Sequence, residues 1–566
     1  MAYAHSVYIN GRIFTVAADF AIASSVAITG DVITAVGTDD DVAAHIGPDT
    51  VVIDLEGNTV LPGINDSHLH AIAFGLDTPP LSLDVSYPTV RSIADVVEAV
   101  GAAVDDVSEG EWIIGTGWDE GYLDECRDES GRSPTRWDLD AVSARNPVFL
   151  QDFSRHTSWV NSAAMKLAGV DEHTAVPEGG RTVKNSEGTL TGIFMEGAQA
   201  LVQTALPTLD DDRREKAARS AIASLQREGI TSFTDPALGP GGEALAGGAM
   251  GSGGLATYAK LAAADELGIR VSVLLLPCGM SGTADEFARN LASMVPPISS
   301  DPRKFRVLGV KVFADGIPLS KTSWMHEEYV GGGCGSLCVG GETDERRVEQ
   351  VTEMIRRGHV EGYQVGVHVT GDRAIDTVAS ALIAAQRDYP RADPRHYLIH
   401  GDFVSRETLD RLAEAGIGVN MNPTIKWTIA DLEPEFVGAE RAAYEFPYRS
   451  AVQSGVRLMS SSDAPVTMPN WRQGLSTMIL RESKATRTVS GQSETISLEQ
   501  ALRTYTIDAA WQDLADDWKG SIEVGKVADL TVIEGDLGAV DAHDIPAMAV
   551  LRTVVGGVTV YDRSTQ

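Results

Sequence analysis

The sequence predicts an α/β fold: a TIM-like (β/α)8 barrel, a β-sandwich built from both termini, and a subdomain inserted after the first barrel strand. Three observations lead to this prediction. Strand-like and helical runs alternate through the centre, both ends hold short strand-like runs, and one long interval interrupts the alternation. At 566 residues, a large domain with accessories is expected. The predicted ranges are 1–60 and 511–566 for the sandwich, 61–510 for the barrel and 75–210 for the insert.

The composition argues against several classes of partner. With 46 basic and 80 acidic residues, the formal net charge is −34 at pH 7, which repels nucleic acid and anionic membranes; adaptation to salt is an alternative reason for this charge. No signal peptide and no apolar run of the roughly 20 residues that span a bilayer is found. Four cysteines are too few for a disulfide framework in a chain of this length, and the pair Cys334 and Cys338 is only a weak metal signature. We therefore expect free thiols. We expect a cytoplasmic protein with a small-molecule substrate, without nucleic-acid or membrane partners; a homodimer is compatible with the sequence.

Short strand-like runs characterise both chain ends. Residues 7–9 and 12–16, separated by Asn10-Gly11, have the pattern of a β-hairpin. Neither end alone supplies enough strands for a stable core, so both ends together are expected to form one sandwich. The further runs are 25–28, 31–36, 51–55, 529–533 and 554–560.

The centre of the chain has the alternation of a parallel sheet wound with helices. Helical spacing is found at 215–228, 261–267, 344–358 and 405–416, and the last two runs end in glycine. Eight strands are the number that closes a (β/α)8 barrel. The predicted strands are 59–66, 230–235, 269–277, 307–315, 364–370, 397–402, 417–423 and 456–463.

One interval is too long to be a connection. Residues 74–210 separate the first two predicted strands and carry helical and strand-like patterns of their own, which indicates an inserted subdomain. Because it follows the C-terminal end of a strand, where barrel active sites lie, we expect it to cover the site. Two glycine-rich stretches, 238–254 and 331–341, also follow strands. Mobile lids and plain flexible loops explain them equally well.

The chemistry begins in the run LPGINDSHLH at 61–70. In an extended chain the side-chain period of two places Asp66, His68 and His70 on one face. Two imidazoles on one face can hold a metal ion, although an isolated His-x-His pair is common without one.

Further ligands are found near the ends of other predicted strands. His368 lies near the end of the fifth strand, His400 near the end of the sixth, and Asp463 ends the eighth. These are the positions at which a barrel collects its catalytic groups.

In the fourth strand the alternation points Lys311 into the barrel. A buried lysine is costly and needs a reason. An ion pair with Asp463 or Asp315 is one reason, and carbamylation to an anionic, metal-bridging ligand is the other. His68, His70, Lys311, His368, His400 and Asp463 together predict a metal site. Nitrogen and oxygen ligands suit one or two zinc ions, with manganese, iron or cobalt as alternatives.

At these residues the sequence resembles the amidohydrolase superfamily, in the large-insert branch that includes N-substituted formamide deformylase. The resemblance is nearly end to end and is specific for family rather than substrate. It implies a metal-dependent hydrolase with a distorted barrel, a sandwich from both termini and a lysine carbamate at Lys311. Asn65 stands where many relatives have isoleucine and should point away from the metal. The motifs are LPGINDSHLH (61–70), SRHTSWVNSAAM (154–165), GTLTGIFMEGA (188–198), VKVFADGIPLSKT (310–322), HVTGDRAID (368–376), LIHGDFVS (398–405), SSDAPV (461–466), ALRTYTIDAA (501–510) and KGSIEVGKVADLTV (519–532).

The predicted reaction is metal-assisted hydrolysis of a C–N bond of an amide, formamide, carbamate or urea. Asp463 is the candidate general base, and His368 and His400 hold a second metal or steady the oxyanion. Asp66 and Asp372 are candidates for fixing a histidine tautomer. Asp372 is equally a candidate N-cap for a helix that starts at Arg373.

Candidate substrate contacts lie in the insert and in the loops, although each residue taken alone is more readily explained by packing. Their aromatic members suggest a small, partly apolar, aryl-bearing substrate. The candidates are Trp118, His156, Trp159, Asn161, Trp324 and Asn422.

Two other functions compete with this prediction. An amino-heterocycle deaminase on this fold usually carries a glutamate three residues after the fifth-strand histidine, where this chain has Gly371, and it gives Lys311 no role. A non-catalytic scaffold would typically lose ligands, whereas all six are present.

Overall fold

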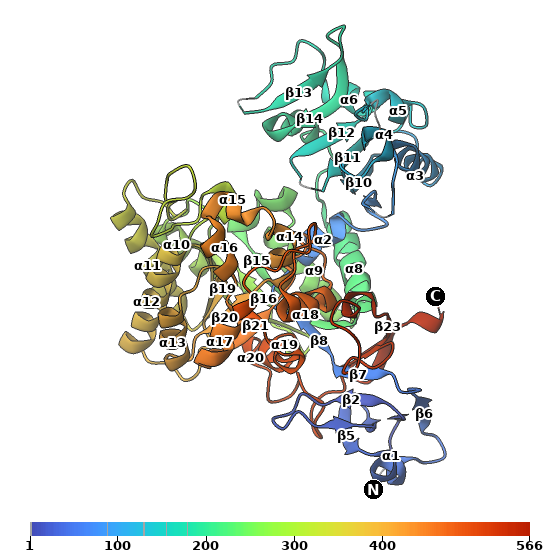
Figure 1. The fold of residues 1–566 in the computed structure, drawn as a ribbon, viewed down its shortest axis with the longest axis vertical. Coiled ribbons are helices and arrows are strands. Elements are labelled where there is room, and N and C mark those ends of the chain that lie inside the picture. The colour runs from blue at the N-terminus through green and yellow to red at the C-terminus, as the bar shows by residue number, and fades with distance from the viewer. Residues whose placement is uncertain (1–2, 88, 128–130, 154, 178, 566) are drawn as a thin grey trace. The chain divides into compact units, whose positions relative to one another are not determined.

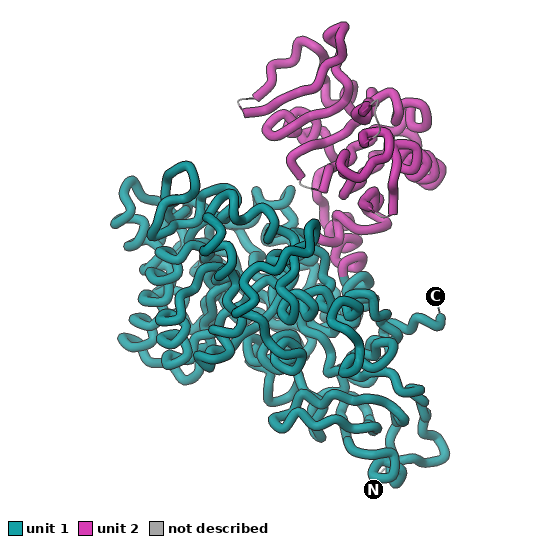
Figure 2. The backbone as a smooth tube through the Cα atoms, in the orientation of Figure 1, with its two compact units in different colours: residues 1–73, 222–566 teal, residues 74–221 magenta. Residues whose placement is uncertain are grey.

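The computed structural model describes residues 3–87, 89–127, 131–153, 155–177 and 179–565. The chain forms two compact units, one of residues 1–73 and 222–566 and the other of Phe74–Ala221 (Figure 2). None of the described helices is both long and apolar enough to cross a membrane.

An eight-stranded parallel sheet is the centre of the first unit, with helices packed around it (Figure 1). This confirms the predicted barrel. Hydrogen bonds just beyond the first and last strands bring them together: Ser67 Oγ donates to Ser460 O at 2.7 Å, and Asp463 N donates to His68 O at 2.9 Å. In spatial order the strands are β8 (Ile64–Asp66), β15 (Ile230–Leu238), β16 (Arg270–Leu275), β17 (Phe305–Phe313), β18 (Gln364–Val369), β19 (Tyr397–His400), β20 (Gly418–Met421) and β21 (Leu458–Ser460).

Helices follow the barrel strands, and side-chain caps begin several of them. Thr343 Oγ1 accepts from Arg346 N at the start of α11, and Ser405 Oγ accepts from Thr408 N at the start of α13. The main helices are α8 (Asp211–Arg227), α9 (Ser252–Ala263), α10 (Ala284–Ser293), α11 (Asp344–Val360), α12 (Asp372–Asp388), α13 (Arg406–Glu414), α14 (Pro423–Ile429), α17 (Tyr448–Ser454), α18 (Trp471–Leu480), α19 (Leu498–Thr504) and α20 (Ile507–Gln512).

Two helix boundaries differ from the prediction. Gly358, the predicted end of α11, lies inside the helix. A Cβ at this position would sit 2.7 Å from Val310 Cγ2, so the glycine allows the helix to pack closely on the strand. Gly362, with φ of +92°, follows the end of the helix. The helix predicted at 261–267 is α9, which begins inside the glycine-rich stretch 238–254 and ends at Ala263. The interpretation of the glycine-rich stretches as lids stays a prediction.

Strands from both ends of the chain share one core. Ile13 and Val26 pack in one cluster with Leu530 and Val554, and β7 (Thr59–Pro62) pairs antiparallel with β22 (Leu530–Ile533), as the predicted sandwich requires. One sheet has the order β5 (Val32–Gly37), β4 (Ser25–Thr29), β1 (Ser6–Ile9), β6 (Val51–Asp54). The other has the order β24 (Val558–Asp562), β23 (Val550–Val555), β22 (Leu530–Ile533), β7 (Thr59–Pro62), β2 (Arg12–Phe14), β3 (Ile22–Ala23).

The hairpin predicted around Asn10-Gly11 is wrong. β1 pairs with β4 and β6, whereas β2 pairs with β3 and β7. The turn therefore carries the chain from one sheet to the other. A local turn signal gives the reversal of the chain but not the partner of each strand.

The second unit, Phe74–Ala221, contains a six-stranded mixed sheet and two apolar clusters of its own. Its sheet has the order β13 (Arg181–Lys184), β14 (Leu190–Met195), β12 (Thr157–Val160), β11 (Val148–Asp152), β10 (Ile113–Trp118), β9 (Leu83–Asp84). Its helices include α3 (Ile93–Asp105), α5 (Arg136–Asp140) and α6 (Ser162–Ala168). That this subdomain covers the site stays a prediction.

Candidate metal centre

Four histidines and an aspartate meet at one end of the barrel. His68 Nε2 lies 3.0 Å from Asp463 Oδ1, and His70 Nε2 lies 3.5 Å from the same oxygen. The His400 ring is 5.3 Å from the His68 ring and 4.6 Å from the His368 ring, measured between centroids. The structure thus brings together residues that the sequence places on different strands.

The donor atoms of this group fit a divalent metal ion. His68, His400 and Asp463 are buried and offer ligand atoms that all lie within 4.8 Å of one another. Both ring nitrogens of His68, Nδ1 of His70 and Oδ1 of Asp463 are buried without a hydrogen-bond partner among the described residues. Buried polar atoms are rarely left without partners, and nitrogen and carboxylate donors suit zinc and its neighbours.

The protonation of His68, His368 and Asp463 favours metal binding. His70 is the exception: burial opposes its charged form, but the contacts with Asp235 and Asp463 outweigh burial and raise its pKa. Burial, followed by the charge of Lys311, lowers the pKa of His68 to about 3 and that of His368 to about 4. Burial opposes ionisation of Asp463, but the adjacent His68 outweighs it and holds the pKa of Asp463 well below its usual value. Neutral imidazoles and an ionised carboxylate are the forms that bind metal.

Lys311, on β17, is 1% exposed, and its Nζ lies 4.7 Å from the centroid of the Phe313 ring. Burial lowers its pKa to about 8, although Asp463 and Asp235 favour the charged form. No direct ion pair joins Lys311 to Asp463 or Asp315 in the described part of the chain, so Asp463 acts on the lysine charge only at longer range.

Hydrogen bonds to two histidines determine which ring nitrogen is free. Asn422 Oδ1 accepts from His400 Nδ1 at 2.7 Å, which leaves Nε2 of His400 as the free nitrogen. His368 Nε2 donates to Gly316 O at 3.1 Å, which leaves its Nδ1 free. Asn422 Nδ2 in turn donates to Ser461 Oγ at 2.9 Å. Asn422 was predicted to contact substrate, but its amide is buried and both ends are used to orient His400.

Asp235 belongs to the site and was missed in the sequence. It lies on β15 and is 1% exposed, with Oδ1 3.8 Å from His70 Nδ1, while Tyr258 Oη donates to Oδ2 at 2.9 Å. Its position near the end of the second barrel strand, in the run ITSFTD, was the available signal.

The two predicted positioning aspartates have other partners. Asp66 Oδ1 accepts from Ser462 N at 3.1 Å and from His68 N at 3.4 Å, so it ties together the backbones of the two ligand segments rather than a histidine ring. Burial raises its pKa to about 7. Asp372 Oδ1 accepts from His326 N at 2.8 Å. The N-cap of α12 is Gly371, and Asp372 is the first helical residue, so the N-cap prediction was wrong.

Three residues of the insert that were predicted to contact substrate are buried and make contacts within that unit. Trp118 Nε1 donates to Leu150 O and Trp159 Nε1 to Thr135 O, and both rings are buried in one apolar cluster. Asn161 caps α6 by accepting from Ala164 N at 2.9 Å. The spacing of the motif did not distinguish a core-facing strand position from one facing a pocket.

The other two candidate substrate contacts, His156 and Trp324, contact charged side chains. His156 Nδ1 lies 2.9 Å from Glu196 Oε2 at the surface. Trp324 is 3% exposed, and Arg373 stacks on its ring at 4.1 Å. Their contact with substrate stays a prediction. Asn65 donates from Nδ2 to Asp513 Oδ2 at 2.8 Å, in agreement with its expected direction away from the metal ligands.

Two of the candidate ligands have an unusual backbone conformation. His400 has φ of +77° and Asp463 has φ of +55°, a left-handed conformation that is costly for residues other than glycine. Such conformations are concentrated at functional sites. Here they turn the side chains at two strand ends toward the common centre.

Comparisons with known proteins agree with this architecture. The model of the amidohydrolase family matches residues 51–561. N-substituted formamide deformylase from Arthrobacter pascens is 29% identical, with 98% of each chain covered. Putative amidohydrolase YtcJ from Bacillus subtilis is 27% identical, with coverage of 99% of this chain and 100% of that protein.

Solved structures share the fold. An uncharacterized metal-dependent hydrolase from Pyrococcus furiosus superposes with a TM-score of 0.69 at 24% identity, covering 94% of this chain and 99% of that chain. Atrazine chlorohydrolase TrzN from Arthrobacter aurescens, complexed with zinc, gives a TM-score of 0.53 at 14% identity, covering 98% and 95%. Together with the family match, these findings lead to one conclusion: the chain belongs to the amidohydrolase family, and it is a hydrolase that acts on carbon–nitrogen bonds.

Proposed function

We propose that this protein hydrolyses the C–N bond of a small, partly apolar amide, formamide, carbamate or urea. The observation that carries the proposal is the convergence of His68, His400 and Asp463 within 4.8 Å in a buried site. The full-length similarity to a protein named N-substituted formamide deformylase makes formamides the first substrates to test.

The ligands would be His68, His70, His368, His400 and Asp463, with a carbamate on Lys311 as the sixth. Zinc is the best match to this donor set, as one or two ions. A divalent ion bound there supplies a lowered pKa for water and polarisation of the substrate carbonyl. Lys311 suits carbamylation because its lowered pKa, about 8, increases the fraction of neutral amine that can react with carbon dioxide.

Asp463 is proposed as the general base. Its pKa lies well below the usual value, so it is ionised at neutral pH and can accept a proton from the attacking water. The same carboxyl then delivers that proton to the leaving amine nitrogen. His368 and His400, adjacent to Asp463, would steady the developing oxyanion where they are not engaged as ligands.

Exposed apolar side chains next to the ligand segments support a partly apolar substrate. Ile317, which directly follows the hydrogen-bond partner of His368, is 49% exposed, and Val466, three residues after Asp463, is 63% exposed. The aryl preference inferred from the sequence loses its basis at Trp118 and Trp159, which are core residues.

The test is a substrate panel with separate detection of amine and ammonia. N-substituted formamides, other amides, ureas and aminopurines are incubated with metal-loaded protein, and the metal content is measured in parallel. We expect the protein to release amine. The double variant His68→Ala/His70→Ala should lose both this activity and the bound metal. Ammonia release from aminopurines alone would instead support the deaminase function, and the absence of turnover in a metal-loaded protein across the panel would contradict the proposal.

A further inference from the structure

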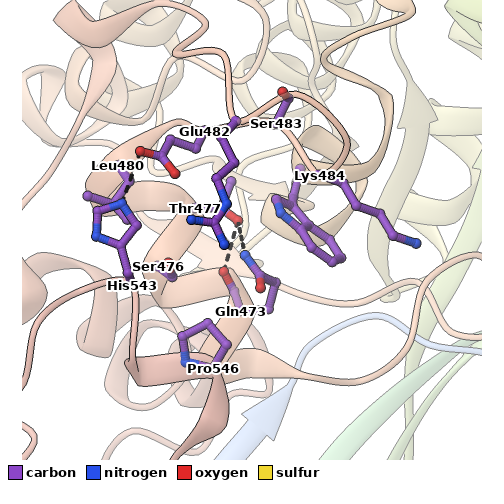
Figure 3. A pocket seen from close by; sticks show the side chains of 11 residues that line it. Gln473, Ser476, Thr477, Leu480, Glu482, Ser483, Lys484, His543 and Pro546 are labelled. Carbon is purple, nitrogen blue, oxygen red and sulfur yellow. Dashed lines mark hydrogen bonds and ion pairs between the residues drawn. The ribbon is translucent and has the colours of Figure 1, made fainter. Parts of the chain in front are cut away.

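A polar cavity of about 150 Å³ lies outside the metal centre, between α14, α18, the segment 482–489 and the region of η7 (Ile545–Ala547) (Figure 3). Strand pairing between Glu482 and Val489, and a hydrogen bond from Ser483 N to Thr488 O at 3.0 Å, make 482–489 a hairpin. Lys484 N donates to Trp427 O at 2.8 Å and fixes this hairpin to α14. The cavity is therefore bounded by anchored segments.

The charge of the cavity lining is opposite to that of the chain. Lys484, Arg487 and His543 line it with a single acidic residue, Glu482, whereas the whole chain has 80 acidic and 46 basic residues. Glu482 Oε1 lies 3.0 Å from His543 Nε2, and a dashed line marks this ion pair in Figure 3. Asp541 Oδ1 lies 2.7 Å from Nδ1 of the same ring. Both carboxylates therefore contact His543, which balances one of their two charges, and neither forms an ion pair with Lys484 or Arg487 among the described residues.

Arg487 has no hydrogen bond or ion pair with another residue of the described chain, and its φ is +56°. That conformation is unfavourable for a residue with a side chain. The hairpin that imposes it is fixed by Asp431, whose carboxylate accepts from Ser483 Oγ at 2.8 Å and from Ala485 N at 3.2 Å. An anchored turn thus presents an arginine with an unused guanidinium to a cavity.

Neutral polar groups complete the lining. Gln473 and Thr477 lie one helical turn apart on α18 and face the cavity, with Gln473 Nε2 donating to Thr477 Oγ1 at 3.3 Å (Figure 3). Ser476 contributes a further hydroxyl. On the α14 side, Lys484 Nζ lies 5.3 Å from the centroid of the Trp427 ring.

We propose that this cavity binds a small oxyanion, such as inorganic phosphate or a short carboxylate, through Arg487 and Lys484. A guanidinium offers paired N–H groups that match the oxygens of either anion, and an ammonium adds a point charge. A volume of about 150 Å³ accommodates such an ion with some of its water, since one water occupies about 30 Å³ of liquid. The site is independent of the proposed hydrolytic function.

The test is isothermal titration of the full-length protein with phosphate and with acetate, at ionic strength held constant with sodium chloride. Trp427 fluorescence provides a second signal. Arg487→Gln and Lys484→Gln remove one charge each from exposed side chains, so folding should be unchanged, and a thermal melt checks this. Arg289→Gln on α10 is the matched control, since Arg289 is exposed and does not line the cavity.

One saturable site is expected, with affinity reduced about tenfold or more by each cavity variant, as for loss of a charge-assisted hydrogen bond, and unchanged by Arg289→Gln. Preference for phosphate or for acetate then identifies the source of the oxyanion. Three results would overturn the proposal: no saturation, equal weakening by all three variants, or binding that Arg487→Gln and Lys484→Gln leave intact, which would place the anion elsewhere, such as at the metal centre.

Discussion

Lys311 is the residue on which the nature of the metal site depends. An ammonium beside divalent ions is strongly repelled, because the ions dominate the local field, and this side chain is buried among the ligands. Carbamylation reverses the charge and supplies oxygen ligands. The proposed carbamate would therefore account for both the burial of the lysine and the composition of the site.

We predict that Lys311→Ala loses bound metal and activity together, with partial recovery of both in the presence of bicarbonate or a short carboxylic acid. Lys311→Arg should not recover, because a guanidinium stays charged and cannot carry the carbamate. Elemental analysis and turnover measure these effects, and carbon NMR of protein exposed to labelled bicarbonate detects the carbamate. Full activity in a metal-loaded protein without that signal would favour a site built on His68, His70 and Asp463 alone.

Asp235 is a second decisive position, since its free oxygen lies 3.8 Å from His70 Nδ1. A carboxylate this close to Nδ1 favours a proton on that nitrogen electrostatically, which leaves Nε2 for metal. Asp235→Asn is therefore expected to weaken metal affinity by about tenfold or more, measured by competition with a chelator.

Tyr258→Phe tests the support of this carboxylate, since it removes only the hydroxyl that donates to Asp235. We expect a smaller decrease in metal affinity. The control is Tyr397→Phe, which removes another buried hydroxyl that lacks a hydrogen-bond partner in the described structure. Equal effects of the two tyrosine variants would mean that the Asp235 contact is unimportant.

The packing of α11 against the barrel strands leaves no room for a side chain at one position. At Gly358 in α11, an added Cβ would lie 2.7 Å from Val310 Cγ2 and 3.1 Å from Val365 Cγ2. Gly358→Ala should lower the free energy of unfolding by about 1–3 kcal/mol, as overpacking typically does. In α3, Gly101→Ala meets only ordinary contacts, at 3.6 Å from Val142, and should stabilise its helix by roughly 0.5–1 kcal/mol. Urea unfolding of both variants decides whether close packing or helix propensity governs these sites.

A buried histidine pair joins α11 to the start of β19 and predicts acid sensitivity. Val365 N donates to His396 Nδ1 at 2.9 Å, His396 and His359 share a hydrogen bond of 2.8 Å, and His359 Nε2 contacts Tyr389 O at 2.7 Å. Burial is the main cause that lowers the pKa of His396 to about 3 and lowers that of His359, with Arg391 adding to both. Every ring nitrogen is used when both rings are neutral.

In the unfolded chain His396 takes up a proton at about pH 6.5, whereas in the folded chain it does so only near pH 3. The contribution of this pair to the free energy of unfolding is therefore complete above about pH 6.5. That stability is lost as the pH falls from there toward 3, by up to about 1.4 kcal/mol per pH unit for each proton. Urea unfolding at several pH values measures the slope. His396→Asn, which keeps an acceptor for Val365 N, should have a shallower slope; an unchanged slope would assign the acid sensitivity to other groups.

At the scale of the whole first unit, a buried ion pair links the barrel to the sandwich. Arg270 of β16 donates from Nε and Nη2 to Asp529 at 2.6 and 2.8 Å, next to β22. Its guanidinium also lies 5.3 Å from the Trp518 ring centroid. The pair is almost fully buried, so neither charge can be solvated if the other is removed.

Arg270→Met should therefore destabilise the unit by about 3–5 kcal/mol, since it leaves Asp529 charged and unpaired. Adding Asp529→Asn removes that charge and should restore part of the loss. Thermal unfolding of the single and double variants measures the coupling, and strictly additive effects would show that the two side chains act independently.

The sequence by itself determined the architecture and the set of side chains that meet at one end of the barrel, because both depend on local patterns. Alternating strand-like and helical runs identify a barrel, and a barrel places His68, His368, His400 and Asp463 at strand ends on one face. Tertiary structure decided what depends on distant partners: β1 and β2 belong to different sheets, Trp118 and Trp159 pack in a core, Asn422 orients His400, and Asp235 approaches His70. Side-chain period gives the face on which a residue lies. The residue that it meets on that face is set by pairing and packing between segments far apart in the chain.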